Sequence, residues 1–257
     1  MPITNIHKMT SATVKLIEED VESGGKEQDM DGIENDFAFN NSVHNANINI
    51  RLGFLRKVYG LLSIQLLMTV MIATILMSFQ TLKTFIQENP WTLILSFLMT
   101  MGTLIVLFVK RRDHPVNLLL LTLFTLSKAY TIGILVSMYD VTTVVQALFI
   151  TLTVTAGLTV YTFQSKKELS FSTSGLFIGL WILLLGGIMQ IFLQSTMLEL
   201  TLGIAGAIIM SMFIVFDTRL IMHTLSPEEY ILATINIYLD VVNLFVYILR
   251  ILAVSKQ

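Results

Sequence analysis

The chain has 257 residues, of which 54% are hydrophobic and only 13% are charged, and it contains no cysteine. Average soluble domains carry about 25% charged residues, so this composition indicates a membrane protein. The absence of cysteine excludes disulfides, thiolate metal sites and thiol catalysis, and the lack of a basic, aromatic-rich patch outside the membrane flanks argues against nucleic-acid binding.

The first 50 residues form an acidic tail. They hold nine acidic residues against three lysines, a formal charge of −6. A segment of this kind buries too little apolar surface to offset the entropy of ordering. We therefore expect a disordered cytosolic tail at residues 1–50, followed by a transmembrane domain at residues 51–257.

Seven apolar runs follow the tail, each close to the roughly 20 residues that a helix needs to cross a bilayer. Their separators are short, most of them carry proline or charged residues, and no soluble domain fits between them. The sequence thus predicts an all-α integral membrane protein with seven transmembrane helices. The predicted spans are residues 58–79, 91–109, 116–138, 141–163, 173–194, 197–219 and 230–252.

Basic residues in the short loops set the expected orientation, because they are enriched on the cytosolic side. The loops on the side opposite the N-terminus contain a single basic residue, Lys83. The sequence therefore predicts a cytosolic N-terminus. Arg250 and Lys256 disturb this pattern if the last run crosses fully, so a re-entrant seventh segment with a cytosolic C-terminus stays open. The basic residues on the side of the N-terminus are Arg51, Arg56, Lys57, Lys110, Arg111, Arg112, Lys166, Lys167 and Arg219.

The last run carries a polar stripe, in which Asn236, Asp240 and Asn243 recur at helical spacing on one face. Asp240 lies near the middle of the run, where a charge needs a protein or water partner. A second acid, Asp217, lies near the end of the preceding run, so the two can meet. If they do, they share a proton and titrate as a unit, and without the proton they offer the hard oxygens that calcium prefers. The alternative is that each aspartate only caps or hydrogen-bonds a neighbouring helix.

Other polar residues inside the runs have simpler interpretations. Lys128, near the centre of the third run, should either pair with an acid or lose its proton at that depth, so we expect a counter-ion or a gate. Gln65, Gln146 and Gln190 are typical of hydrogen bonds between membrane helices. The four histidines lack the HxxxH or HExxH spacing of a zinc site.

Five stretches resemble the Bax-inhibitor-motif family, and within it the lifeguard-type branch of Golgi anti-apoptotic proteins. The likeness covers about residues 34–257. The stretches are FLRKVYGLLSIQLL (54–67), HPVNLLLLTLFTL (114–126), GLTVYTFQSKKE (157–168), GLFIGLWIL (175–183) and LSPEEYILATINIYLDVVNLFVYILRIL (225–252).

The resemblance implies a seven-helix fold in which the other helices surround a central C-terminal helix. It also implies residence in Golgi and related endoplasmic-reticulum membranes, and a pH-sensitive calcium leak that lowers store calcium and inhibits apoptosis. The family's di-aspartyl proton sensor maps to Asp217 and Asp240, which would hold calcium transiently. The latch found in bacterial relatives maps to Arg111, and Glu228 matches an acid tied to ion conduction.

Two residues depart from the family pattern. Lys128 stands where relatives of the Golgi branch typically carry glutamate, and Asn236 stands where many carry an acid. Both changes remove negative charge from the expected pathway, which Asn243 would also line. The resemblance therefore supports the fold more strongly than the calcium flux.

Three functions are consistent with the sequence. The first is a calcium leak channel gated by protonation, with calcium as the conducted ion and no cofactor. The second is a non-conducting regulator that binds apoptosis proteins or other calcium channels, alone or as an oligomer. The third is an intramembrane aspartyl protease, but the contexts VFDT and IYLDVV lack the glycines of the GxGD pattern. We do not expect an enzyme.

Overall fold

The computed structural model describes residues 48–165 and 173–256. The expected tail lies outside these residues, as do the loop lysines Lys166 and Lys167. Residues 48–50 are an exception: they already belong to the first described helix, so the boundary expected at residue 51 falls inside that helix.

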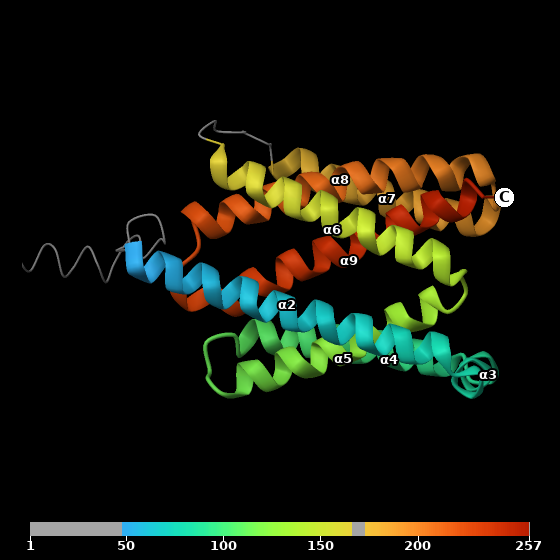
Figure 1. Cartoon of the computed structure of the whole chain (residues 1–257), viewed down its shortest axis with the longest axis horizontal. Helices are drawn as coiled ribbons and strands as arrows, with labels where there is room; N and C mark the ends of the chain where they lie inside the picture. The colour runs from blue at the N-terminus through green and yellow to red at the C-terminus, as the bar shows by residue number, and fades with distance from the viewer. Residues whose placement is uncertain (1–47, 166–172, 257) are drawn as a thin grey trace, which may run out of the picture.

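Seven of the described helices are long and apolar enough to cross a membrane, which confirms the prediction of an all-α membrane protein (Figure 1). Their ends agree with the predicted spans within a few residues, except that the first helix begins ten residues earlier. They are α2 (Ile48–Ser78), α4 (Trp91–Val109), α5 (Val116–Val136), α6 (Val141–Gln164), α7 (Thr173–Leu193), α8 (Thr196–His223) and α9 (Tyr230–Val254). Inside a bilayer the helix is favoured because it satisfies its own backbone hydrogen bonds.

Two short helices were not predicted. The helix α3 (Gln80–Glu88) follows α2 after a break at Phe79, and it is seen end-on in Figure 1, across the direction of the bundle. Phe79 and Phe85 are exposed around it, as is Trp91 at the start of α4. Exposed aromatic residues next to the ends of spanning helices are typical of the membrane interface. The 3₁₀ helix η1 (Pro227–Glu229) lies between α8 and α9.

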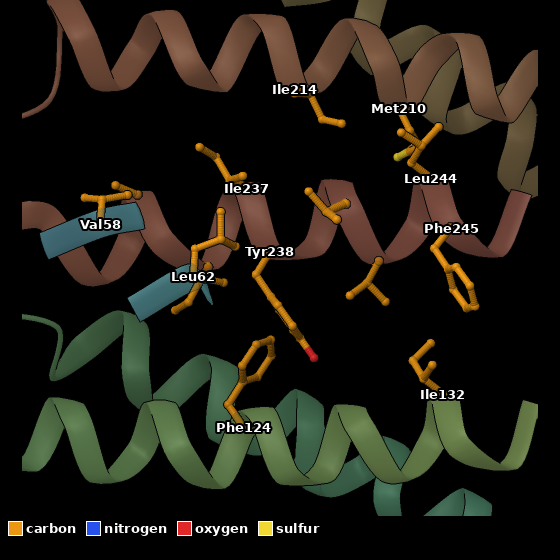
Figure 2. Packing of buried hydrophobic residues seen from close by; sticks show 14 of the residues in the cluster. Val58, Leu62, Phe124, Ile132, Met210, Ile214, Ile237, Tyr238, Leu244 and Phe245 are labelled. Atoms are coloured by element: carbon orange, nitrogen blue, oxygen red, sulfur yellow. The ribbon is translucent and has the colours of Figure 1, made fainter. Parts of the chain in front are cut away.

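The last helix, α9, occupies the centre of the bundle. Half of its most apolar window is buried, against 11% for the peripheral α7. It contacts α8, α6, α2 and α5. Figure 2 shows Ile237, Tyr238, Leu244 and Phe245 of α9 among core residues of α2, α5 and α8. The central C-terminal helix implied by the family resemblance is therefore present.

The helix α9 is also unbroken. Its 25 residues correspond to about 37 Å at about 1.5 Å per residue, more than the roughly 30 Å of a bilayer core. The C-terminus lies at the end of the bundle opposite the start of α2 (Figure 1). This geometry favours a complete crossing over a re-entrant segment.

Close helix contacts occur at glycines on α8. A side chain at Gly206 would overlap the ring of Tyr247 on α9, and one at Gly203 would meet Ile251, also on α9. Small residues allow membrane helices to approach closely. Gly203 and Gly206 thus lie on the side of α8 that approaches α9.

Candidate functional site

Asp217 of α8 and Asp240 of α9 lie together inside the bundle. Each is only 7% exposed, and their side chains are hydrogen-bonded to each other. A carboxylate only accepts hydrogen bonds, so a bond between two carboxyl groups requires a proton on one of them. Two carboxyl groups in this arrangement can share one proton, and the second oxygen of Asp240, Oδ2, is buried without a protein partner among the described residues.

The turn between α8 and α9 sets this meeting point. Ser226 accepts a hydrogen bond from the backbone N–H of Glu228 at 3.4 Å, and Pro227 starts η1. The two helices leave the turn as an antiparallel pair in direct contact. Asp217 precedes the turn and Asp240 follows it, so the turn brings the two helix segments that carry them side by side.

The other members of the polar stripe occupy the side of α9 that carries Asp240. Asn236 and Asn243 are half-buried and recur with Asp240 at helical spacing. Tyr247, a turn further along, lies against Gly206 of α8. The stripe therefore faces protein over much of its length, as a bilayer requires of polar side chains.

Arg111, expected to act as a latch on the aspartates, contacts a different acid. Its Nη2 lies 3.1 Å from Oε1 of Glu229, and Nη2 of Arg112 lies 3.2 Å from the same oxygen. The Glu229 side chain is only 15% exposed. The two arginines thus tie the α4–α5 loop to the start of α9, and Arg111 pairs with Glu229 in this structure instead of with the aspartates.

Neighbouring residues complete this end of the bundle. Nζ of Lys110 donates a hydrogen bond to Asp113 at 2.8 Å, which raises the pKa of Lys110. Glu228, which the resemblance connects with conduction, is exposed. The sequence did contain a signal for the Glu229 contact, because the basic KRR and the acidic PEE motifs belong to loops predicted at the same end.

Lys128 is half-buried in α5. Among the residues that the structure describes, no acidic side chain forms an ion pair with it. The expected role as a counter-ion of the aspartates is therefore not seen in this conformation.

A second buried polar network, which the sequence reasoning missed, joins α9 to α2 and α5. The hydroxyl groups of Tyr238 and Thr69 lie 2.9 Å apart, and Nε2 of Gln65 donates to Thr125 at 2.8 Å. The Gln65 bond confirms the interhelical role expected of that residue. Closer to the turn, Asn117 donates to the hydroxyl of Tyr230 at 3.0 Å. The available signal in the sequence was that Tyr230, Thr234 and Tyr238 follow one another at intervals of four residues.

A tight metal centre is not built from acidic residues in the described part of the chain. No group of three or more His, Cys, Asp or Glu side chains comes together there. Calcium is usually held by about six to eight oxygens. A site of only two carboxylates is better suited to an ion that passes with part of its water shell than to an ion that stays bound.

Comparison with known proteins places these residues in a family context. Residues 51–257 match the family model described as "Inhibitor of apoptosis-promoting Bax1". The chain is 44% identical over 225 residues to the Golgi anti-apoptotic protein of vaccinia virus, covering 88% of this chain and 95% of that protein. It is 43% identical over 226 residues to protein lifeguard 4 of Mus musculus, with the same coverage.

A more distant relative is Bax inhibitor 1 of Schizosaccharomyces pombe, 36% identical over 210 residues, which are 81% of this chain and 79% of that protein. The residues that match the family model, 51–257, include all seven spanning helices, from the first turn of α2 to the end of α9. The chain is therefore a member of the Bax-inhibitor family.

Proposed function

We propose that the protein inhibits apoptosis from Golgi membranes, with the endoplasmic reticulum as a related site, by acting as a pH-sensitive calcium leak. The name of the vaccinia relative, Golgi anti-apoptotic protein, and the description of the family model support the first part. The hydrogen bond between Asp217 and Asp240 is the observation that carries the second part. The N-terminal end of the bundle would face the cytosol.

The proposed mechanism is an exchange of the shared proton for a calcium ion. With the proton in place, the hydrogen bond holds α8 and α9 together through Asp217 and Asp240. Without it, two carboxylates at close range repel each other and form a dianionic pair of hard oxygens. The unpartnered Oδ2 of Asp240 is the atom best placed to take up the ion.

Calcium efflux from proteoliposomes over a series of pH values tests this mechanism. Metal binding displaces protons from its ligands, so raising calcium should move the midpoint of the flux–pH curve to lower pH. Asp240→Asn should abolish both the pH dependence and its shift with calcium. Asp140→Asn, an exposed aspartate in the turn before α6, is the matched control and should leave both unchanged.

An Asp240→Asn curve that overlays the unchanged protein would disprove the exchange. Cleavage of a membrane-anchored reporter by the same proteoliposomes would instead support a protease, which also uses two aspartates with one proton.

A non-conducting regulator is the second candidate, because the name of the vaccinia relative states an effect on apoptosis and that of the Schizosaccharomyces pombe relative states inhibition of Bax, a protein target. Two variants separate the candidates in a cell-survival assay. A leak requires Asp240 and tolerates deletion of residues 1–33. A regulator that binds partners through its tail shows the opposite result, with protection retained in Asp240→Asn and lost in the deletion.

A further inference from the structure

An open apolar groove of about 560 Å³ runs along the bundle between α6 and α8. One wall is α6 from Ile150 to Tyr161, and the other is α8 from Ala207 to Val215. Leu244 and Ile248 of the central helix line the groove as well. Both of these α9 residues are buried and form the floor of the groove, on the side where α6 crosses α8 and α9 in Figure 1.

The length of the groove matches one leaflet of a bilayer. The eleven residue steps from Ile150 to Tyr161 correspond to about 16 Å of helix at about 1.5 Å per residue. Half of a hydrocarbon core about 30 Å thick is about 15 Å. The groove begins near the middle of α6 and ends three residues before its last residue, Gln164, so it spans the half of the bundle that contains the helix end.

The groove is continuous with the surface that meets lipid. Phe149, Leu152 and Val160 of α6 are exposed beside it on a helix that crosses the membrane. Apart from the hydroxyl groups of Ser211 and Tyr161, the side chains that line it are apolar. Because α6 and α8 touch each other and both touch α9, the opening between them is too narrow for a further helix, which needs about 8–10 Å between axes.

From this geometry we propose that the groove binds one acyl chain of a bilayer phospholipid. The chain would lie along α6 and α8, above the floor that Leu244 and Ile248 of the central helix form. Leu244 follows Asp240 by one helical turn, so the bound chain would lie about one turn of α9 away from that aspartate. This lipid site does not depend on the proposed calcium leak.

Photo-crosslinking in proteoliposomes tests the proposal with the full chain. The probe is phosphatidylcholine with a diazirine on one acyl chain, present in trace amounts in unlabelled phosphatidylcholine, and the sites are mapped by mass spectrometry. We expect labelling of residues 150–161 and 207–215 at least several-fold above that of the lipid-exposed segment 177–185 of α7. Ala207→Phe fills the groove and should reduce groove labelling to the level of α7.

Ala156→Phe is the matched control, because Ala156 is exposed on α6 outside the groove. It should leave groove labelling unchanged. Ser211→Leu is a second filling variant, used if Ala207→Phe does not give a folded protein by circular dichroism and size exclusion. Equal labelling of the groove and α7, with no effect of either filling variant, would show ordinary surrounding lipid only. Competition by cholesterol but not by excess phospholipid would show a sterol site and overturn the acyl chain.

Discussion

Asp240 and Tyr238 are two residues apart on α9, and they point to opposite sides of that helix. Residues i and i+2 of a helix are separated by about 200° around its axis. Asp240 therefore meets Asp217 of α8, whereas Tyr238 meets Thr69 of α2 and packs against Phe124 of α5, with ring centroids 6.0 Å apart (Figure 2). One side of the central helix carries Asp240, which meets Asp217. The opposite side is held by a hydrogen bond between uncharged hydroxyl groups.

The first prediction at this scale concerns Glu229. Glu229→Gln removes the charge that holds Arg111 and Arg112, so the α4–α5 loop should separate more readily from α9. A partly exposed ion pair contributes at most about 1 kcal/mol, which limits the expected increase in calcium leak to about fivefold. The measurement is efflux from proteoliposomes at one fixed pH.

Glu228→Gln is the comparison for this experiment, because Glu228 is the adjacent acid and is exposed. The structure predicts a smaller effect there than at Glu229. A change in leak for Glu228→Gln and none for Glu229→Gln would contradict the latch formed with Glu229 and would favour the role that the family resemblance assigns to Glu228.

At the scale of the elements, the pairing of α8 with α9 depends on close approach. Gly206 sits directly against the Tyr247 ring, three ring atoms of which would overlap a methyl group at that position. A ring is rigid and cannot yield as the end of a flexible side chain does. This contact sets the spacing of the two helices that carry the aspartates.

We therefore predict that Gly206→Ala lowers the free energy of unfolding by about 1–3 kcal/mol, the usual range for an overpacked core. Thermal unfolding in detergent is the measurement. Gly157→Ala on α6 is the control: nothing lies within 4 Å of its added methyl group, so helix propensity should make it neutral or stabilising. Tyr247→Leu should restore stability to the Gly206→Ala protein, and failure to do so would place the strain elsewhere.

At the scale of the whole molecule, α2 begins at one end of the bundle and α9 ends at the other (Figure 1). Arg250 and Lys256 thus lie at the end that is otherwise poor in basic residues. The structure shows how Lys256 is accommodated: its Nζ donates to Thr143 at 2.9 Å and to Gln146 at 3.0 Å. These contacts offset the preference of basic residues for the cytosolic side.

This arrangement predicts that the two termini lie on opposite sides of the membrane. In cells permeabilised only at the plasma membrane, a tag at the N-terminus should be accessible to antibody, and a tag at the C-terminus should be protected until the organelle membrane is dissolved. A tag on the α4–α5 loop should behave like the N-terminal tag. Antibody access to both termini before dissolution would show that α9 does not cross completely.

The sequence by itself determined the number of crossings and the inward position of Asp240, because both depend on local pattern. About 20 apolar residues must form a helix in a bilayer, and a carboxylate such as Asp240 within one must turn toward protein. Its meeting with Asp217 was also foreseeable, since the short turn at Pro227 forces α8 and α9 to run side by side.

Only the tertiary structure decided the contacts between residues distant in sequence. The choice of Glu229 as the partner of Arg111, the bond from Tyr238 to Thr69 and the groove between α6 and α8 all depend on how the helices rotate and cross. Hydropathy does not encode these quantities, because in lipid the helices are sorted by close packing and a few polar bonds rather than by burial of apolar surface.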